Sequence, residues 1–453
     1  MDQTTELISA YAYRLTYADL NPATVHQVKR TLVDTLGCAL GGYLSEPAKI
    51  ARRLAGGVTS ATPARVIGTR DHSSLDLAGF ANGVMVRYLD CNDSYFSPGG
   101  GHPSDMIPAA LVVADTLQSD GRSIITAIAL AYEVFCRLSD QVVSGDLGWD
   151  QGMFSVIGAA CAAGKVLGLN QTQLGHAISL AITPHLPLGV TRVGELPLWK
   201  GCAAASATRS AIFAAQLAAE NMTGPNEPFE GRRGLWEQAG VTPPVRLERF
   251  GGGDQDFRIN RTTFKFYPAQ IHTQAPIGLA VELAPQVDLS QLEAIRIRTY
   301  RAAASSAATE PEKWDPKTRE TADHSIPYLV AVALSDGNVT PNSFTAGRIT
   351  DPALRNLISR MTITEDPAFT RNYPGQYQCR IEVATRSGAT VAAETSYPKG
   401  HRNNPLSDAE ISGKFRQLAQ PTITDQQCTE ALDLLWHLED LPHLTGVYDA
   451  LVV

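Results

Sequence analysis

Three long segments rich in alanine, glycine and serine dominate the first half of this chain and constrain its fold more than any other feature. They are ITAIALAYEVFCRL (125–138), GAACAAGKVLGL (158–169) and KGCAAASATRSAIFAAQLAA (200–219). Apolar stretches of this length without proline favour helices, and small side chains allow the axes of neighbouring helices to approach closely. We therefore predict a compact helical core in this half of the protein.

Helix start signals appear at both ends of the chain. Asn21 precedes a proline, which is typical of an N-cap followed by the first helical residue. Near the C-terminus, Ser407 with Glu410 and Thr424 with Gln427 have the spacing of capping boxes. Because helices pack most readily on helices, we expect the two C-terminal helices to return to the helical core.

The middle of the chain has a different pattern. Between Asn221 and Arg261 proline and glycine replace the apolar runs, which marks a loop-rich connection. Beyond it, LEAIRIRTY (292–300) has the period of a strand, and QYQCRIEVATRSGATVAAETSY (376–397) predicts a hairpin that turns at Ser387-Gly388. We predict a mainly α fold with an α+β second domain: residues 1–262 and 400–453 form the helical domain, and residues 263–399 form a smaller α+β lid domain.

Charge and motif content exclude several classes of function. Lys and Arg total 38 against 46 Asp and Glu, a net charge of -8, which opposes a general attraction to nucleic acid or to anionic membranes. Seven scattered cysteines without a C-x-x-C pair indicate reduced thiols in a cytoplasmic protein. No apolar stretch reaches the length of a membrane span, and the N-terminus lacks a signal peptide's pattern. Standard P-loop, zinc-protease and serine-hydrolase motifs are absent.

A glycine-rich segment contains the strongest candidate for catalysis. Asp90 and Asp93 are followed by Gly-Gly-Gly-His102, directly before an apolar helical run. The positive end of a helix dipole favours a neutral imidazole, which would be a usable general base near pH 7. The alternative interpretation is structural, with the two aspartates as turn or cap residues and His102 bound to the backbone.

Three further clusters carry charged side chains. Lys200 opens the alanine-rich helix, where an ammonium group and free backbone N–H groups would hold a carboxylate or phosphate; a solvated lysine is the alternative. Lys265 and His272 share an apolar, aromatic segment, where low dielectric strengthens charge pairing, although both are equally compatible with a structural role. Asp323 is predicted to be an N-cap and His324 an early-turn residue, so we expect a structural role there.

Taken together, the segments LDCNDSY, GGGHPSD, LPLWKGCAAASATRSAIFAA, MTGP with PFEG, KFYPAQIH and ETADHSIPYLVAVAL resemble the MmgE/PrpD family over nearly the whole chain. The resemblance implies a homodimer with an active-site cleft between its two domains, and catalysis without a metal or organic cofactor. It also implies the following site: catalytic Asp90, His102, Lys200, Lys265 and His272, with Ser94 and Gln151 as substrate-binding residues.

The family resemblance implies an enzyme that acts next to the carboxylates of a small polycarboxylate. The W-K-G and TADHSIPY segments are similar to the dehydratase branch, so the first expectation is dehydration of a 2-methylcitrate-like 2-hydroxy tricarboxylic acid by proton abstraction α to a carboxylate. Several relatives have a histidine where this chain has Gln151, and glutamine cannot shuttle a proton. An iminodisuccinate-type epimerase and a cis-aconitate-type decarboxylase are therefore alternatives, and a non-catalytic helical scaffold is a third.

Overall fold

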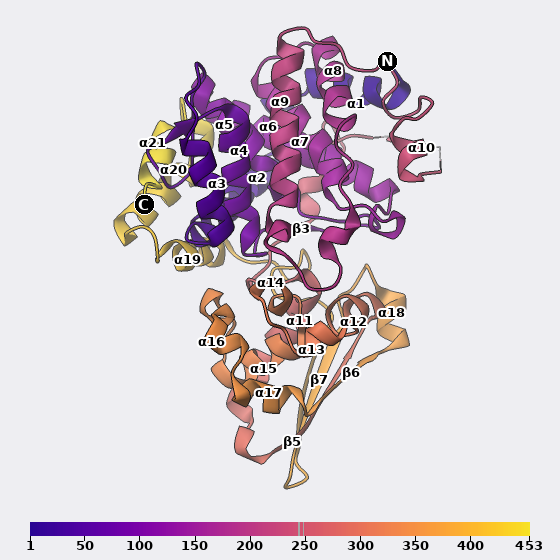
Figure 1. Ribbon diagram of the computed structural model, residues 1–453, viewed down its shortest axis with the longest axis vertical. Coiled ribbons are helices and arrows are strands. Elements are labelled where there is room, and N and C mark those ends of the chain that lie inside the picture. The colour runs from indigo at the N-terminus through magenta and orange to yellow at the C-terminus, as the bar shows by residue number, and fades with distance from the viewer. Residues whose placement is uncertain (243–244, 248) are drawn as a thin grey trace.

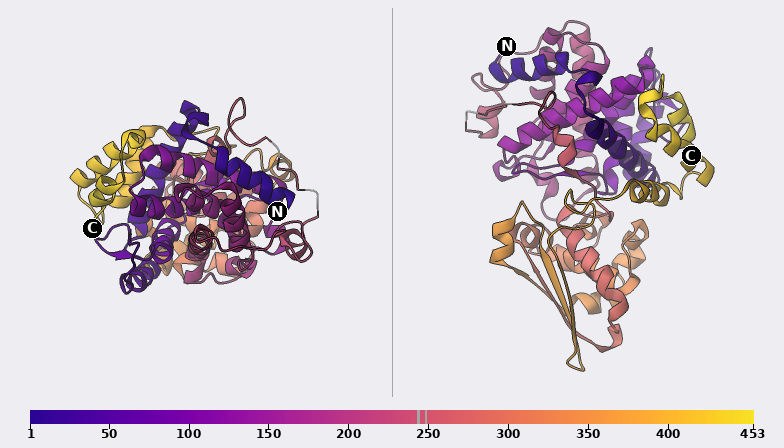
Figure 2. Two further views of the ribbon diagram at one scale, coloured as in Figure 1. Left: turned by 90° about the horizontal axis from the view of Figure 1, so that it is seen from above. Right: turned by 180° about the vertical axis from the view of Figure 1, so that it is seen from behind.

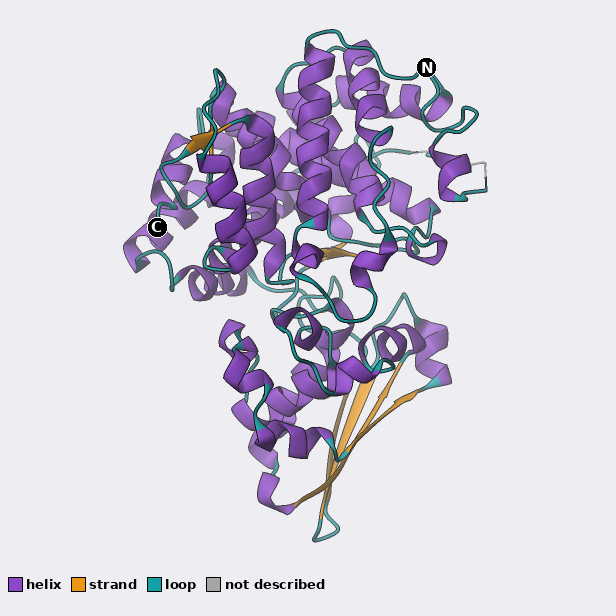
Figure 3. Cartoon of the chain, viewed as in Figure 1, coloured by secondary structure: helices purple, strands orange, loops and turns teal. Residues whose placement is uncertain are grey.

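The computed structural model describes residues 1–242, 245–247 and 249–453 (Figure 1). Helices dominate the chain, and most strand residues gather in one small sheet (Figure 3). Buried apolar side chains form two large cores, one built from residues 8–264 and 406–451 and the other from residues 267–383. The predicted fold class is confirmed: both chain ends contribute to a large helical domain, and a smaller α+β domain lies between them in the sequence.

The helical domain contains helices from both ends of the chain. Its α2 begins where the sequence predicted, because Asn21 accepts a hydrogen bond from the backbone N–H of Thr24 at 2.8 Å. The helices of this domain are α1 Gln3–Arg14, α2 Pro22–Gly42, α3 Glu46–Gly56, α4 Leu75–Tyr88, α5 Ile107–Leu117, α6 Gly121–Gln141, α7 Gly152–Val166, α8 Gln171–Ile182, α9 Ala203–Ala219, α10 Leu235–Ala239, α19 Asp408–Ala419, α20 Asp425–Trp436 and α21 Thr445–Ala450.

Small residues let the central helices approach closely. A Cβ atom on Gly158 of α7 would lie 2.8 Å from the carbonyl oxygen of Ala131 on α6. A Cβ atom on Gly83 of α4 would lie 2.9 Å from the Cβ of Ala205 on α9. Neither site has room for a methyl group without a backbone shift, because protein interiors are close-packed. The predicted close contact between small-residue helices is confirmed.

The C-terminal helices return to the helical domain, as predicted, and lie beside the N-terminal helices in both views (Figures 1 and 2). α19 packs on α2 so closely that a Cβ on Gly37 would be 3.0 Å from the Cα of Phe415. Both predicted capping boxes are present, at Ser407 and at Thr424. The last helices are therefore part of the same core as the first.

The α+β domain has a four-stranded sheet in the order β6-β5-β7-β8. Strand β5 is parallel to β6 and antiparallel to β7, and β7 and β8 form the predicted hairpin, with Gly388 at φ +87° in the turn. Helix α11 packs against β7 and β8. The elements of this domain are α11 Gln274–Leu283, β5 Leu292–Thr299, α12 Arg301–Ala307, α13 Pro311–Trp314, α14 Arg319–Ala322, α15 Ile326–Asp336, α16 Ala346–Ile349, α17 Pro352–Ile358, β6 Met361–Glu365, α18 Pro367–Asn372, β7 Cys379–Thr385 and β8 Thr390–Thr395.

Two short strands bring distant segments together. β3 (Ser94–Tyr95) pairs with β4 (Thr262–Thr263), which places the segment that follows Asp90 beside the segment that precedes Lys265. A second short pair joins β1 (Ala64–Arg65) to β2 (His72–Ser73). The proline- and glycine-rich connection between Asn221 and Arg261 contains α10; its residues 243–244 and 248 lie outside the described residues.

All seven cysteines are buried and unpaired. Within the described ranges, no helix has both the length and the hydropathy that crossing a bilayer requires.

Candidate active site

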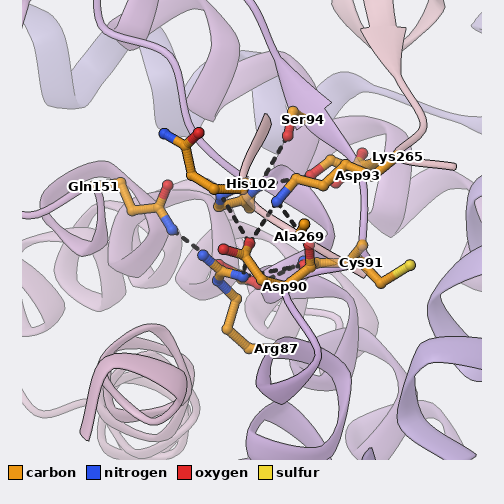
Figure 4. Close-up of polar contacts among 12 residues, drawn as sticks. Arg87, Asp90, Cys91, Asp93, Ser94, His102, Gln151, Lys265 and Ala269 are labelled. Atoms are coloured by element: carbon orange, nitrogen blue, oxygen red, sulfur yellow. Dashed lines mark hydrogen bonds and ion pairs between the residues drawn. The ribbon is translucent and has the colours of Figure 1, made fainter. Parts of the chain in front are cut away.

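Asp90 is the centre of a buried cluster of charged side chains. It follows α4 with φ +51°, a left-handed conformation that aspartate tolerates better than most residues. Its carboxylate contacts Arg87 and Lys265, and its Oδ2 lies 3.1 Å from the Nζ of Lys200 (Figure 4 shows Arg87 and Lys265). Burial alone would raise the pKa of Asp90, but these three cations outweigh it and hold the pKa well below its ordinary value.

Lys200 connects this cluster to the second domain. Its Nζ lies 3.2 Å and 3.3 Å from the two carboxylate oxygens of Asp323. Asp323 also contacts Arg319 and the Nδ1 of His324, whose Nε2 lies 3.5 Å from Asp90 Oδ2. The ion network therefore spans both domains, with Lys200 on one side and Asp323 on the other.

The predicted role of Asp323 as an N-cap is wrong. Ser325 caps α15, accepting a hydrogen bond from the N–H of Tyr328 at 3.0 Å, whereas Asp323 follows the end of α14. Asp323 instead supplies negative charge for the buried ammonium group of Lys200, because a buried charge without a partner is strongly unfavourable. His324, which the sequence assigned to the first turn of a helix, belongs to the same network.

Three side chains of this network have possible metal-ligand atoms within 4.8 Å of one another: Asp90, Asp323 and His324. Lys200 Nζ already contacts both carboxylates, and Lys265 and Arg87 contact Asp90. A metal ion at this position would have to displace an ammonium group, so these residues fit an internal ion network better than a metal centre.

His102 has a defined tautomer. It precedes the 3-10 turn Pro103–Met106, and its Nδ1 lies 2.7 Å from the main-chain oxygen of Asp93 and 3.0 Å from the hydroxyl of Ser94. A carbonyl oxygen only accepts, so Nδ1 carries the hydrogen and Nε2 has the free lone pair. Burial lowers the pKa of His102 well below its ordinary value, and Arg87 and Lys265 lower it further. The imidazole is therefore neutral at pH 7 and can accept a proton at Nε2.

The orientation of His102 comes from the backbone more than from Asp90. Its Nε2 is 3.8 Å from Asp90 Oδ1, which is beyond hydrogen-bond distance, whereas Nδ1 is bound to Asp93 and Ser94. Asp90 instead balances the positive charges of Arg87, Lys200 and Lys265.

A cavity of about 360 Å³ opens between the two domains beside His102. The helical domain contributes its glycine loop, in which Gly100 and Gly101 have φ of +55° and +145°. A Cβ on Gly101 would lie 2.6 Å from the ring of Phe135, so only glycine fits there. The cavity is lined by Ser94, Tyr95, Phe96, Ser97, Pro98, Gly99, Gly100, Gly101, His102, Ser144, Gly145, Trp149, Asp150, Gln151, Gly189, Arg192, Ile271, His272, Tyr373 and Tyr377.

His272 lines the cavity from the second domain. It lies in the 3-10 turn Ile271–Thr273, and its Nδ1 is 2.6 Å from the phenol oxygen of Tyr300. Burial and, to a smaller extent, the charge of Lys265 lower the pKa of His272 to about 4, so the ring is neutral at pH 7. Burial also raises the pKa of Tyr300 well above its ordinary value, so the phenol keeps its proton. Among the described residues Nδ1 of His272 is the one acceptor within hydrogen-bond distance of this hydroxyl, and we infer that the phenol donates a hydrogen bond to it. The hydrogen of His272 is then on Nε2, which makes this ring a donor where His102 is an acceptor.

The structure places the remaining predicted residues in two groups. Ser94 and Gln151 line the cavity with His102 and His272, and Gln151 donates to Asp105 at 3.3 Å. Asp90, Lys200 and Lys265 are almost completely buried and are not among the cavity-lining residues.

Sequence reasoning missed two charged residues. Arg87 lies three residues before Asp90, a helical spacing that favours an ion pair and could have indicated it. Arg192 lines the cavity and pairs with Asp150 at 2.6 Å, and no motif signalled it.

The pKa of Asp93 predicts that the stability of the protein depends on pH. Burial raises its pKa to about 7, although Ser104 and Tyr132 donate to its carboxylate. Between pH 4 and 7 the folded protein keeps a proton that the unfolded chain has released, so stability falls as pH rises through this range. From pH 5 to pH 8 we expect Asp93 to cost about 2–3 kcal/mol, at 1.36 kcal/mol per pH unit up to its pKa.

Urea unfolding of the wild type and of Asp93→Asn at pH 5 and pH 8 checks this expectation. The asparagine variant should lose less stability between the two pH values than the wild type. Equal pH dependence in both proteins would contradict the assignment to Asp93.

Comparison with known proteins identifies the family of this chain. The MmgE/PrpD N-terminal domain model matches residues 6–247, and the MmgE/PrpD C-terminal domain model matches residues 267–438. A 2-methylcitrate dehydratase of Cupriavidus necator is 29% identical over 402 residues, 83% of this chain and 81% of that protein. A 2-methylcitrate dehydratase of Escherichia coli is 26% identical over 93% of this chain and 92% of its own length. Human cis-aconitate decarboxylase is 24% identical over 96% of this chain and 92% of its own length. Because the two family models together match most of its length, this chain belongs to the MmgE/PrpD family.

Proposed function

We propose that this protein is a hydro-lyase that removes water from a small 2-hydroxy tricarboxylic acid of the 2-methylcitrate type. The observation that carries the proposal is the neutral His102, which lines the cavity and whose Nδ1 is bound to Asp93, so that Nε2 carries the lone pair that can accept a proton. The relatives named 2-methylcitrate dehydratase, at 26–29% identity over most of this chain, support this choice of reaction.

The reaction begins with proton abstraction. His102 Nε2 takes the proton from the carbon next to a substrate carboxylate, and the electron pair of the C–H bond moves toward that carboxylate. Negative charge develops there, and the field of Arg87, Lys200 and Lys265 behind the cavity wall stabilises it. Because these groups are already fixed by Asp90, little reorganisation is needed.

Loss of the hydroxyl group completes the reaction. The C–O bond at the neighbouring carbon breaks as the carbon–carbon double bond forms. His272 Nε2–H donates a hydrogen bond to the departing oxygen, and the imidazolium of His102 returns the proton that converts hydroxide to water. Both histidines then have their starting protonation states, so the cycle is balanced.

Gln151 leaves a second reaction open, because no proton can be exchanged at an amide. A cis-aconitate-type decarboxylation, the reaction named for the human relative, needs a proton donor but no departing hydroxyl group. In this chain Gln151 donates to the carboxyl group of Asp105, whose pKa burial raises to about 6, so Asp105 is a group beside Gln151 that can exchange a proton near neutral pH.

Mass spectrometry separates these reactions. The purified protein is incubated with 2-methylcitrate, citrate and cis-aconitate, and the products are analysed. Loss of water from 2-methylcitrate is the expected result. Loss of carbon dioxide from cis-aconitate, without loss of water from either hydroxy acid, would indicate a decarboxylase instead of a dehydratase. An epimerase would change the optical rotation of an iminodisuccinate sample without changing its mass.

A non-catalytic scaffold makes a different prediction. Citrate at 100 times its dissociation constant should stabilise a protein that binds it by about 2.7 kcal/mol. Thermal unfolding with and without citrate measures this. No stabilisation, together with no turnover of any polycarboxylate, would exclude an enzyme of this class.

A further inference from the structure

The cavity contains a second charged pair, separate from the cluster at Asp90. Arg192 ends the 3-10 turn Gly189–Arg192 in the connection between α8 and α9. Its Nε lies 2.6 Å from Asp150 Oδ2, and its Nη2 lies 3.4 Å from Asp150 Oδ1. The Asp150 side chain is fully buried, whereas 26% of the Arg192 side chain is exposed. The guanidinium group is therefore anchored on one edge and accessible on the other.

Backbone contacts fix this pair in place. Asp150 N–H donates to the carbonyl of Pro187 at 2.9 Å, and Gly189 N–H donates to the carbonyl of Gly148 at 2.8 Å. The Oδ1 of Asp150 also accepts from the N–H of Gly152, at the start of α7. The segment that carries Arg192 is thus held against the segment that carries Asp150, which limits the directions in which the guanidinium can point.

The charge environment leaves Arg192 available for a ligand. Among the described residues that line the cavity, Arg192 is the only one that is an arginine or a lysine. Lys200 and Lys265 are buried and already hold internal carboxylates. Within the described ranges, Asp150 is also the one residue that hydrogen-bonds to the Arg192 guanidinium, so Nη1 keeps its hydrogens free.

We propose that Arg192 binds a carboxylate of the substrate that does not take part in the reaction, and that Asp150 holds the guanidinium in position for it. The planar fork of an arginine matches the two oxygens of a carboxylate, which a lysine cannot do. Arg192 then selects acids with a third carboxylate over dicarboxylates. This inference rests on the proposed function, since it assumes a polycarboxylate in the cavity.

Binding of two unreactive acids tests this role. Propane-1,2,3-tricarboxylate has no hydroxyl group to eliminate, and succinate lacks the third carboxylate. Calorimetry should show that Arg192→Met weakens binding of the tricarboxylate about 10- to 100-fold, the range for a lost charged hydrogen bond, and changes succinate binding by less than about threefold. With the reactive substrate, KM should rise while kcat changes little, because the contact is the same in the ground state and the transition state.

Matched variants guard against simpler explanations. Arg209→Met removes an arginine of α9 that pairs with Asp76 at 3.1 Å on an exposed surface away from the cavity, and it should leave binding unchanged. Arg192→Met combined with Asp150→Asn avoids a buried unpaired carboxylate and should show the same loss of tricarboxylate binding in a folded protein. Arg192→Lys keeps the charge without the fork, so it should restore only part of the affinity.

The outcomes separate this inference from the proposed function. Suppose that the wild type binds both acids. If Arg192→Met then weakens the binding of both acids equally, or weakens the binding of neither, Arg192 does not bind the third carboxylate, and this inference alone fails. If the wild type binds no polycarboxylate and transforms none, the proposed function fails with it. A selective loss for the tricarboxylate supports both.

Discussion

Replacement of His102 by asparagine should lower kcat by about 10²- to 10⁴-fold, the usual contribution of a general base. Asparagine can still donate to the main-chain oxygen of Asp93, which His102 Nδ1 contacts at 2.7 Å, but it has no lone pair that accepts a proton at neutral pH. The fold should therefore persist while the proton-transfer step is lost. Steady-state turnover of 2-methylcitrate and the thermal unfolding midpoint measure the two effects.

A second histidine provides the control for this variant. His437 follows α20 with 65% of its side chain exposed, so His437→Asn makes the same chemical change far from the cavity and should leave kcat unchanged. Undiminished turnover in His102→Asn would remove His102 from the mechanism. A large drop in the unfolding midpoint would show that the ring has a structural role instead.

Replacement of Lys414 by methionine should destabilise the protein by about 3–5 kcal/mol, the cost of breaking a buried ion pair from one side. Lys414 of α19 donates to Asp34 at 2.6 Å and to the main-chain oxygens of Cys91 and Lys265, each at 2.7 Å. The methionine variant leaves the buried carboxylate of Asp34 without its counter-charge. Urea unfolding of the two proteins gives the difference in unfolding free energy.

The sign of the pH dependence follows from Asp34. Burial raises its pKa despite the nearby Lys414, and loss of the lysine should raise that pKa further. A carboxyl group whose pKa is higher in the folded protein than in the unfolded chain makes the folded protein less stable as pH rises. Because this pKa should be higher in Lys414→Met than in the wild type, the destabilisation by the substitution should be larger at pH 8 than at pH 5. The double variant Lys414→Met with Asp34→Leu removes both charges and should recover much of the loss. A single-variant loss below about 1 kcal/mol would show that the pair is not an important contact.

Local signals in the sequence were sufficient for much of the fold. The caps at Asn21, Ser407 and Thr424 depend on hydrogen bonds within four residues, and all three are present. The alternation in β5 is likewise a local pattern: Ile295 and Ile297 are fully buried as its period predicted. Such features follow from one turn of helix or one strand and need no knowledge of distant residues.

The charged network could not be predicted in the same way. Asp323 has the spacing of an N-cap, but its partner Lys200 lies more than a hundred residues away, and only the meeting of the two domains joins them. Arg192 has no distinctive neighbours in the sequence; its role depends on the pairing of two loops that hold it against Asp150. That Arg192 lines the cavity while Lys200 and Lys265 are buried away from it is also a property of packing, because spacing along the sequence does not encode depth in the fold.

Lys414 has a consequence for the order in which the chain matures. A chain grows from its N-terminus, so Asp34 and Cys91 leave the ribosome long before α19. The ammonium group of Lys414, which their oxygens accept from, is made 380 residues after Asp34 and 323 residues after Cys91. The residues 267–383 that form the second core emerge complete while the first core still lacks Phe415 and its neighbours. We therefore expect that the inserted domain can fold on the nascent chain first, and that the surrounding domain completes its core only after α19 has been made.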